Sequence, residues 1–391
     1  MSQAALEGGD GRDSSPAIVA LRARGATPEA IDAVFAENDV PLVEGGLWTF
    51  LWRGEAHAVA VEHRVVGLTA PLPLRRIAGS DLWYTTLEMP LGARLEYRLL
   101  VRRGADVENT LDPRNPRVAR GPAGEMSAVT GDGYVDPDWA QPGADVPPGK
   151  LTHVRIRSRA LRRFAEITLY APARMEQSGQ YPLLIVHDGN DYLNYSAFGT
   201  VLDNLMHRRW MSDTIVAFTH PRDRMREYAA SAPHTRFLNQ ELVPELERTL
   251  PIRGGGASRV LMGASLGAVA SLCAAVRAPG MYGGLLLESG SVRTTLPAEV
   301  RTRIPALART APFIRSLGAV SSPVTQRIYQ TYGQFEPLAQ SNRSLTPTLR
   351  RLAGDVRVFE ALDGHNWTNW RDRLRDALGW LLPPDAPGRT S

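Results

Sequence analysis

The sequence is poor in cysteine and lysine and has no long apolar segment. Cys273 is the only cysteine among 391 residues, so an internal disulfide is excluded, which fits a reducing compartment. Lys150 is the only lysine, and the arginines are scattered along the chain, which is not typical of a nucleic-acid-binding element. No run of about 18 apolar residues occurs, so we expect no membrane span.

The composition is otherwise that of an ordinary soluble globular protein. Hydrophobic residues make up 43% and charged residues 22% of a chain that is long enough for two domains. The formal net charge of +4 weakly favours anionic ligands. The first 16 residues include acidic side chains and lack the apolar core of a secretory signal. We therefore expect a cytoplasmic protein; the sequence does not determine its oligomeric state.

Changes in composition divide the chain into segments. We expect a disordered N-terminus at 1–15, an N-terminal domain at 16–135, a linker at 136–150, a second domain at 151–385 and a tail at 386–391. The first segment is rich in Gly, Asp and Ser, and the linker is rich in Pro and Gly.

The N-terminal domain combines a short helical pair with short alternating strands. Thr27 and Pro28 are typical of the N-cap and first position of a helix. The alternating segments LWTFLWRG, AVAVEHR, DLWYTTLEM and RLEYRLLVRRG are bounded by Gly, Pro or Asp. This spacing predicts an antiparallel β-sandwich of the early-set or immunoglobulin-like kind. We expect LDPRNPRVARGPAG, residues 111–124, to be an irregular loop.

The second domain alternates apolar strands with helices. The expected strands are HVRIRS, FAEITLYA, YPLLIVHDG, DTIVAFTH, RVLMG, GGLLLESG, RIYQTYG and VRVFEAL. The expected helices lie near 196–209, 236–249, 265–277, 337–352 and 367–382. Alternation of this kind predicts a doubly wound, mostly parallel α/β sheet.

A serine in the pattern G-x-S-x-G lies between a strand and a helix. Ser265 follows the strand RVLMG and precedes the apolar helix AVASLCAAVR. A tight turn in this context lifts a serine hydroxyl to the carboxyl edge of the sheet, where it can act as a nucleophile. Alone, the pattern is more typical of a serine that caps a helix.

An activated serine needs a base and an acid that orients the base. His365 follows the last expected strand and precedes the last helix, so it can return to the sheet edge that holds Ser265. Glu336 lies three residues after Gly333, where a strand ends, and is our candidate acid. Asp363 and Glu288 remain alternatives, as does a Ser–His pair without an acid.

The oxyanion of an acyl-transfer reaction needs backbone N–H donors. Leu266, which directly follows the serine, is one expected donor. Gly189 and Asn190, beyond the strand YPLLIV, are the other candidates. We expect no metal site. The histidine and carboxylates of HDGND follow one strand and His220 follows another, and the two histidines are not spaced i, i+4 as metal-binding histidines on a helix would be.

Several motifs in order carry a family resemblance. LLIVHDGNDYL, RMREY, VLMGASLGAVASL, GQFEP and GHNWTNWRDRL together resemble the esterase-D-like branch of the α/β hydrolases, and within it the enterochelin (ferric-enterobactin) esterases. The resemblance covers about residues 150–382 and extends to the N-terminal sandwich. One departure is Ala268, where many relatives have a second glycine.

The resemblance implies hydrolysis of the ester bonds of a catecholate trilactone by Ser265, His365 and Glu336, with release of iron. It implies no cofactor, since iron arrives within the small-molecule substrate. Arg226 and then Arg224 are the candidate binding residues for an anionic ferric siderophore, because arginine suits such a ligand.

The same residues leave other interpretations open. Trp367 and Trp370 could contact substrate rings or pack in the core. The alternatives for function are a feruloyl or acyl-carbohydrate esterase and a non-catalytic binding protein of the same fold.

Overall fold

The computed structural model describes residues 15–296 and 298–385, which form two compact units. The smaller unit holds the described residues up to Asp136 together with Gly333–Pro337 and Leu362–His365. The larger unit holds Pro137–Tyr332, Leu338–Ala361 and the described residues from Asn366 onward. Residues 1–14 of the predicted disordered N-terminus (1–15) lie outside the described residues, as does the predicted tail at 386–391. Ser15 is described and is fully buried, which contradicts its assignment to that terminus.

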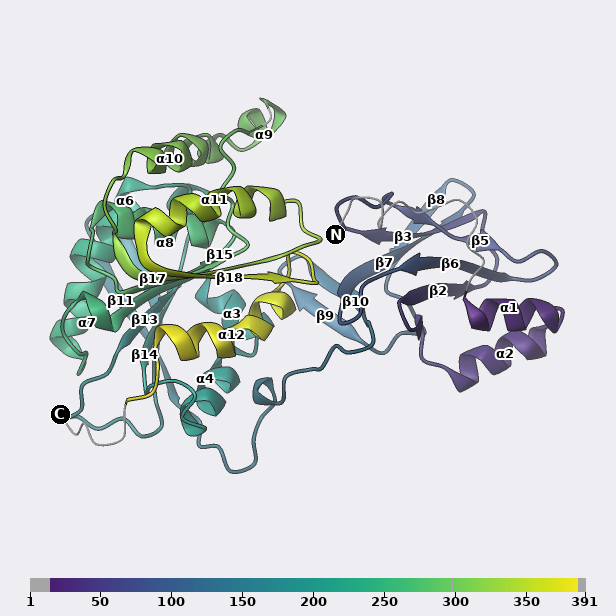
Figure 1. Ribbon diagram of the computed structural model, residues 1–391, viewed down its shortest axis with the longest axis horizontal. Helices are drawn as coiled ribbons and strands as arrows, with labels where there is room; N and C mark the ends of the chain where they lie inside the picture. Colours follow the sequence, from purple (N-terminus) through teal and green to yellow (C-terminus); the bar gives the residue numbers. More distant parts are fainter. Residues whose placement is uncertain (1–14, 297, 386–391) are drawn as a thin grey trace. The chain divides into compact units, whose positions relative to one another are not determined.

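The smaller unit contains two helices and two antiparallel sheets (Figure 1). Its elements are α1 (Pro16–Ala23), α2 (Pro28–Glu37), β1 (Leu42–Glu44), β2 (Leu47–Arg53), β3 (Ala58–His63), β4 (Leu72–Pro73), β5 (Arg75–Arg76), β6 (Leu82–Glu88), β7 (Arg94–Arg103), β8 (Asp106–Thr110), β9 (Val118–Gly121) and β10 (Gly124–Thr130). The sheet orders are β1-β2-β6-β5 and β4-β3-β7-β10-β9, with β8 paired to β7.

Apolar side chains of both sheets form one core, as in a sandwich. Trp48 and Phe50 of β2 pack with Val61 of β3 and Leu95 of β7. Thr27 caps α2 as predicted, since its side chain accepts a hydrogen bond from the Ala30 N–H. The segment predicted as an irregular loop at 111–124 instead contains β9, which pairs with β10. Both strands lack the long apolar alternation that marked the others.

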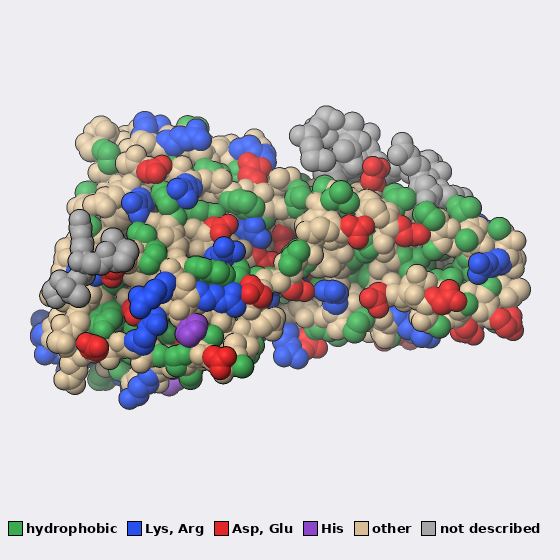
Figure 2. Space-filling model, turned by 60° about the horizontal axis from the view of Figure 1, so that its bottom comes forward, with side chains coloured by type: hydrophobic (Ala, Val, Ile, Leu, Met, Phe, Trp, Pro, Cys, Tyr) green, Lys and Arg blue, Asp and Glu red, His purple; other side chains and the backbone are tan. Residues whose placement is uncertain are grey.

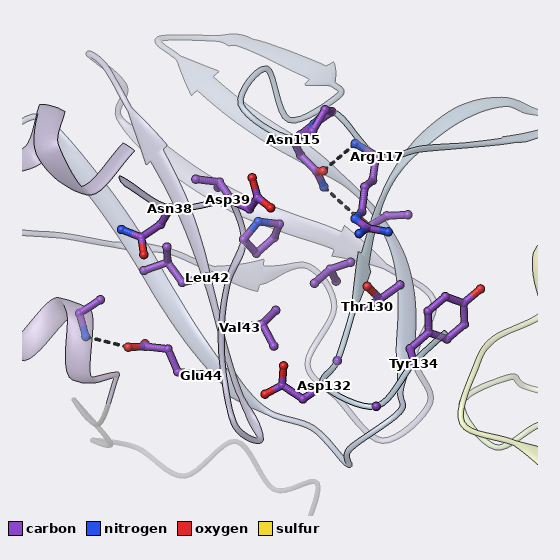
Figure 3. A pocket seen from close by; sticks show the side chains of 18 residues that line it. Asn38, Asp39, Leu42, Val43, Glu44, Asn115, Arg117, Thr130, Asp132 and Tyr134 are labelled. Carbon is purple, nitrogen blue, oxygen red and sulfur yellow. Dashed lines mark hydrogen bonds between the residues drawn. The ribbon is translucent and has the colours of Figure 1, made fainter. Parts of the chain in front are cut away.

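A cavity of about 420 Å³ lies in the smaller unit (Figure 3). Its lining includes Glu44, Asn115, Arg117 and Tyr134. Polar atoms of the lining bind one another: the Arg117 N–H donates to the Asn115 side chain, and Glu44 accepts from the Ala17 N–H.

The larger unit is an eight-stranded sheet with helices on both faces (Figure 1). Its strands are β11 (Lys150–Ser158), β12 (Arg163–Ala171), β13 (Leu183–Val186), β14 (Ile215–His220), β15 (Arg259–Ala264), β16 (Gly284–Glu288), β17 (Thr325–Gly333) and β18 (Ala353–Ala361). Their order is β11-β12-β14-β13-β15-β16-β17-β18, and the pairs from β14 through β13, β15 and β16 to β17 are parallel.

The helices divide between two apolar layers. They are α3 (Gly189–Tyr195), α4 (Phe198–His207), α5 (Arg224–Tyr228), α6 (Ala232–Arg236), α7 (Val243–Thr249), α8 (Leu266–Arg277), α9 (Ala298–Arg303), α10 (Thr310–Ser316), α11 (Ala339–Leu352) and α12 (Trp367–Leu381). Residues of α8 and α11 belong to one core, and residues of α4 and α12 belong to the core on the other face. The central strands are buried on both faces, which explains their unbroken apolar runs.

All eight strands and five helices predicted for this part of the chain are present. The shorter helices α3, α5, α6, α9 and α10 were not predicted, because each has at most seven residues and too few turns for a periodic pattern. The helix predicted at 236–249 is longer because α7 directly continues a π-helical segment at Phe237–Leu242. The predicted linker is not wholly solvated: Trp139 and Ala140 are buried in a core of the larger unit.

Candidate active site

Ser265 lies at the sharp turn between β15 and α8. Its φ is 57° and its ψ is −113°, a strained backbone conformation for a residue other than glycine. The turn is held by the end of β16 and the loop that follows it, since the Ser265 N–H donates to the Glu288 carbonyl at 2.8 Å and the Ser265 carbonyl accepts from the Ser291 N–H at 3.0 Å. This strand–turn–helix geometry is that of a nucleophile elbow.

The two glycines of the motif are required by close backbone approach. A Cβ on Gly263 would lie 2.5 Å from the backbone carbon of Gly267. A Cβ on Gly267 would lie 3.1 Å from the Cβ of His187 at the end of β13. Larger residues at these positions would separate strand from helix, so the glycines serve the turn that exposes the serine.

The serine hydroxyl is half-buried and has a polar neighbour. Its Oγ lies 3.0 Å from the Oγ of Ser291, and either atom can be the donor. The sequence did not single out Ser291, because nothing in the pattern around it marks it as a neighbour of the motif.

Glu336 and His365 contact each other within the smaller unit. The Glu336 Oε2 lies 3.1 Å from the His365 Nδ1, and the Glu336 side chain is fully buried. A carboxylate at Nδ1 keeps the proton on that nitrogen and leaves Nε2 as the basic atom of the neutral ring. The His365 side chain retains 27% exposure, so its ring is open to solvent on part of its surface.

The two rival acids have other partners. Asp363 accepts hydrogen bonds from the Arg94 guanidinium and from the Gly364 N–H. Glu288 accepts from the Tyr192 hydroxyl. Burial raises the pKa of Glu288 to about 8, although the Tyr192 hydrogen bond opposes the shift. A carboxyl that is largely protonated at neutral pH cannot stabilise an imidazolium by charge.

The expected oxyanion donors lie at helix N-termini. Leu266 is the first residue of α8, and Gly189 and Asn190 are the first two of α3. The N–H groups of a first helical turn have no partner within the helix, so they can face a developing negative charge. Gly189 is also confined, because a Cβ there would lie 2.4 Å from the Cβ of Phe218.

The candidate binding residues have distinct environments. Arg224 donates to both carboxylate oxygens of Asp188, at 2.8 and 2.7 Å, and to the Ala264 carbonyl at 3.3 Å. It therefore links the start of α3 to the residue before Ser265, a structural role that the sequence did not predict. The Arg226 side chain is 82% exposed and pairs with Asp223.

The rings of Trp367 and Trp370, the two candidate substrate contacts, meet edge to face. Their ring centroids are 4.7 Å apart, and Trp367 also meets the Tyr192 ring at 5.0 Å. Trp370 is only 5% exposed and its indole N–H donates to the Ser289 hydroxyl. Trp370 is thus a core residue here, whereas Trp367 is partly exposed.

A buried pair of histidines joins the residue after β13 to α6, and the sequence did not predict this contact. The Nε2 atoms of His187 and His234 are 3.1 Å apart. Burial lowers the pKa of His187 to about 4 and holds that of His234 well below its usual value. His234 follows no strand and belongs to no motif, so only the packing of α6 brings it to His187.

A family model of esterases matches residues 158–381, which is more than half of the chain. The chain belongs to this esterase family. The model for the N-terminal domain of enterochelin esterases matches residues 47–138 of the same chain. The protein is therefore a carboxylic ester hydrolase of the enterochelin esterase type, as its motifs predicted.

Curated relatives of this esterase align over most of its length. The iron(III) enterobactin esterase of Dickeya dadantii is 24% identical over 395 residues, covering 88% of this chain and 89% of its own. The uncharacterized protein YjcH of Bacillus subtilis is 26% identical over 244 residues, covering 60% of this chain and 98% of its own.

Solved structures share the fold of this esterase. The ferric enterobactin esterase of Salmonella typhimurium superposes with a TM-score of 0.72 at 21% identity, covering 90% of this chain and 98% of its own. The enterochelin esterase of Shigella flexneri gives 0.69 at 22% identity, covering 88% and 95%. The predicted α/β-hydrolase fold with an N-terminal sandwich is thus confirmed.

The described residues contain neither a membrane-spanning helix nor a cluster of metal ligands. Within 15–296 and 298–385, no helix is long and apolar enough to cross a membrane. In the same ranges, no three or more His, Cys, Asp or Glu side chains gather in a way that could hold a metal ion.

Proposed function

We propose that this esterase hydrolyses the ester bonds of a catecholate siderophore of the enterobactin type and so releases its iron. The observation that carries the proposal is the similarity to iron(III) enterobactin esterases over 88% of the chain, which includes the N-terminal domain. Solved relatives have been crystallised with enterobactin and with 2,3-dihydroxy-N-benzoyl-serine.

In the proposed mechanism, the Ser265 Oγ attacks the ester carbonyl carbon while His365 takes the hydroxyl proton on Nε2. Glu336, held at the His365 Nδ1, orients the ring and stabilises the imidazolium. The N–H groups of Leu266 and of Gly189 or Asn190 bind the oxyanion.

The tetrahedral intermediate then collapses. The bond from the carbonyl carbon to the ester oxygen breaks, and His365 gives its proton to that oxygen, which departs as a hydroxyl group. The acyl group remains on the Ser265 Oγ. A water molecule, activated by His365, hydrolyses this acyl-enzyme and restores the serine. The iron is part of the substrate, and no resident metal or cofactor takes part in the proposal.

A feruloyl or acyl-carbohydrate esterase is the second candidate. A ferulic acid esterase superposes with a TM-score of 0.53 over 60% of this chain. The more extensive alignment of the enterobactin esterases favours the siderophore.

The test is a hydrolysis time course on ferric and iron-free enterobactin, with products identified by mass. We expect wild type to open the trilactone stepwise to trimer, dimer and monomer, and Ser265→Ala to give none of these while keeping its melting temperature. The ferric to iron-free rate ratio tests iron release. If wild type labels with a fluorophosphonate but leaves enterobactin intact, Ser265 is a nucleophile and the substrate assignment is wrong.

A further inference from the structure

The loops that carry Glu336 and His365 are bound by the N-terminal sheets. They follow β17 and β18 in sequence, yet both fall within the smaller compact unit. The Val66 N–H donates to the Phe335 carbonyl and the Arg94 N–H donates to the Leu362 carbonyl, both at 2.9 Å. The loop between β3 and β4 therefore binds the residue next to Glu336, and the first residue of β7 binds a residue close to His365.

The apolar contacts are equally direct. Phe335 is 4% exposed and belongs to the sandwich core with residues such as Trp48 and Leu95. Leu362 packs against the same core. An aromatic side chain buried in this way fixes the backbone that leads into Glu336.

Arg94 adds a buried charge to this anchorage. Its side chain is 5% exposed, and its guanidinium lies 3.4 Å from Asp363 and 2.8 Å from Glu96. Burial disfavours the charge of Arg94, but the carboxylates of Asp363 and Glu96 outweigh it and raise the pKa of Arg94. Asp363 turns its other oxygen to the Gly364 N–H at 2.6 Å, so the carboxylate shapes the backbone that leads to His365.

The two loops are also joined to each other. The Phe335 N–H donates to the Asp363 carbonyl at 3.1 Å. A Cβ on Gly333 would lie 2.2 Å from that carbonyl oxygen, so only glycine permits this approach. A displacement of Asp363 therefore reaches both His365 and Glu336.

We infer that Arg94 is a positioning residue for catalysis: through Asp363 it sets the geometry of the Glu336–His365 pair, so that the N-terminal sandwich orients the general base. The inference rests on the proposed serine-esterase function. It gives the sandwich a part in the reaction that does not depend on which ester is cleaved.

The test compares two carboxylates that both contact Arg94. Asp363→Asn removes the one in the His365 loop, and Glu96→Gln removes the one on β7 as the matched control. Arg94→Lys keeps the charge, and Arg94→Met removes it. The readouts are the rate of fluorophosphonate labelling of Ser265 and kcat and KM for a p-nitrophenyl ester, at temperatures below each variant's melting transition.

We expect Asp363→Asn and Arg94→Met to slow labelling and lower kcat by about 10- to 100-fold, since misplacement of a catalytic group by about 1 Å costs this much. KM should stay within about twofold, because the variants leave the binding residues unchanged. Arg94→Lys should restore much of the rate, and Glu96→Gln should label like wild type. If Arg94→Met does not fold, the labelling rates of Asp363→Asn and Glu96→Gln still test the inference.

Equal labelling rates for Asp363→Asn and Glu96→Gln would overturn the inference. Because neither probe is a siderophore, a wrong substrate assignment does not affect this comparison. Wild type that fails to label would remove the proposed nucleophile, and the inference with it.

Discussion

Glu288 is a buried carboxyl beside the turn at Ser265. It ends β16, its backbone carbonyl accepts from the Ser265 N–H, and its side chain is fully buried. Burial raises its pKa from an ordinary value of 4.5 to about 8, against the opposing hydrogen bond from Tyr192. A pKa of about 8 leaves Glu288 mostly protonated at neutral pH.

This titration predicts a pH dependence of stability. Between pH 4.5 and about 8 the folded protein holds a proton on Glu288 that the unfolded chain has lost. The free energy of unfolding therefore falls as pH rises through this window, by at most about 1.4 kcal/mol per pH unit. Glu288→Gln keeps the shape without the titration, so its stability relative to wild type should increase with pH in this window. Urea unfolding at several pH values measures the difference.

The control for losing one carboxyl is Glu37→Gln, at an exposed position of α2. The free energy of unfolding relative to wild type should change with pH for Glu288→Gln but not for Glu37→Gln. Parallel pH profiles for wild type and Glu288→Gln would contradict a proton held on Glu288.

At the scale of elements, the approach of β15 to α8 determines whether the serine turn forms. Gly263→Ala places a methyl group 2.5 Å from the Gly267 backbone, so strand and helix must separate. We expect a loss of about 1–3 kcal/mol in the free energy of unfolding, as for other overpacked sites, together with slower fluorophosphonate labelling of Ser265. Thermal melts and labelling time courses measure the two effects.

Gly199 in α4 is the matched control, because a Cβ there meets nothing within 4 Å. Gly199→Ala should be neutral or stabilise the protein by up to about 1 kcal/mol, since alanine favours the helix. If Gly263→Ala matched wild type in stability and in labelling rate, the prediction would be wrong, and the turn at Ser265 would tolerate a wider separation of β15 from α8.

The elements that sequence patterns predicted are those with long apolar runs. The strands β13, β15 and β16 are buried on both faces, so their burial leaves a continuous signal in the sequence. The short strands β4 and β5 and the helices α9 and α10 were missed. Their conformation depends on neighbours brought in by the rest of the chain, and two to seven residues carry too little periodicity to reveal it.

At the scale of the whole molecule, the charge is nearly balanced. The formal net charge is +4, and acidic and basic side chains are interspersed over the face shown in Figure 2. Attraction of an anionic substrate then depends on individual exposed arginines rather than on a uniformly basic surface. Of the two arginines that the sequence singled out, Arg226 is the more exposed, with 82% of its side chain accessible against 31% for Arg224.

This predicts an effect of salt. Under the proposed function, the ferric siderophore is more anionic than the iron-free one, because catechol hydroxyls lose protons when they bind iron. We expect kcat/KM to fall with ionic strength more for ferric than for iron-free enterobactin, since the Debye length shrinks to about 10 Å at 0.1 M salt. Arg226→Ala should reduce this salt dependence.

Arg248→Ala is the control, because Arg248 is also exposed and also paired with a carboxylate three residues away. Steady-state kinetics at several salt concentrations give the comparison. Equal salt dependence for the Arg226→Ala and Arg248→Ala variants would remove Arg226 from substrate attraction.

The sequence by itself determined the fold class and the candidate nucleophile. Ser265, its flanking glycines and the strand and helix around them are contiguous, so local patterns carry them. Only the tertiary structure decided which carboxyl meets His365: Glu336 contacts its ring, whereas Asp363, two residues away in the chain, turns to Arg94. Arg94 and Asp363 are 269 positions apart. Contacts between such distant residues follow from the packing of whole elements, which no local pattern encodes.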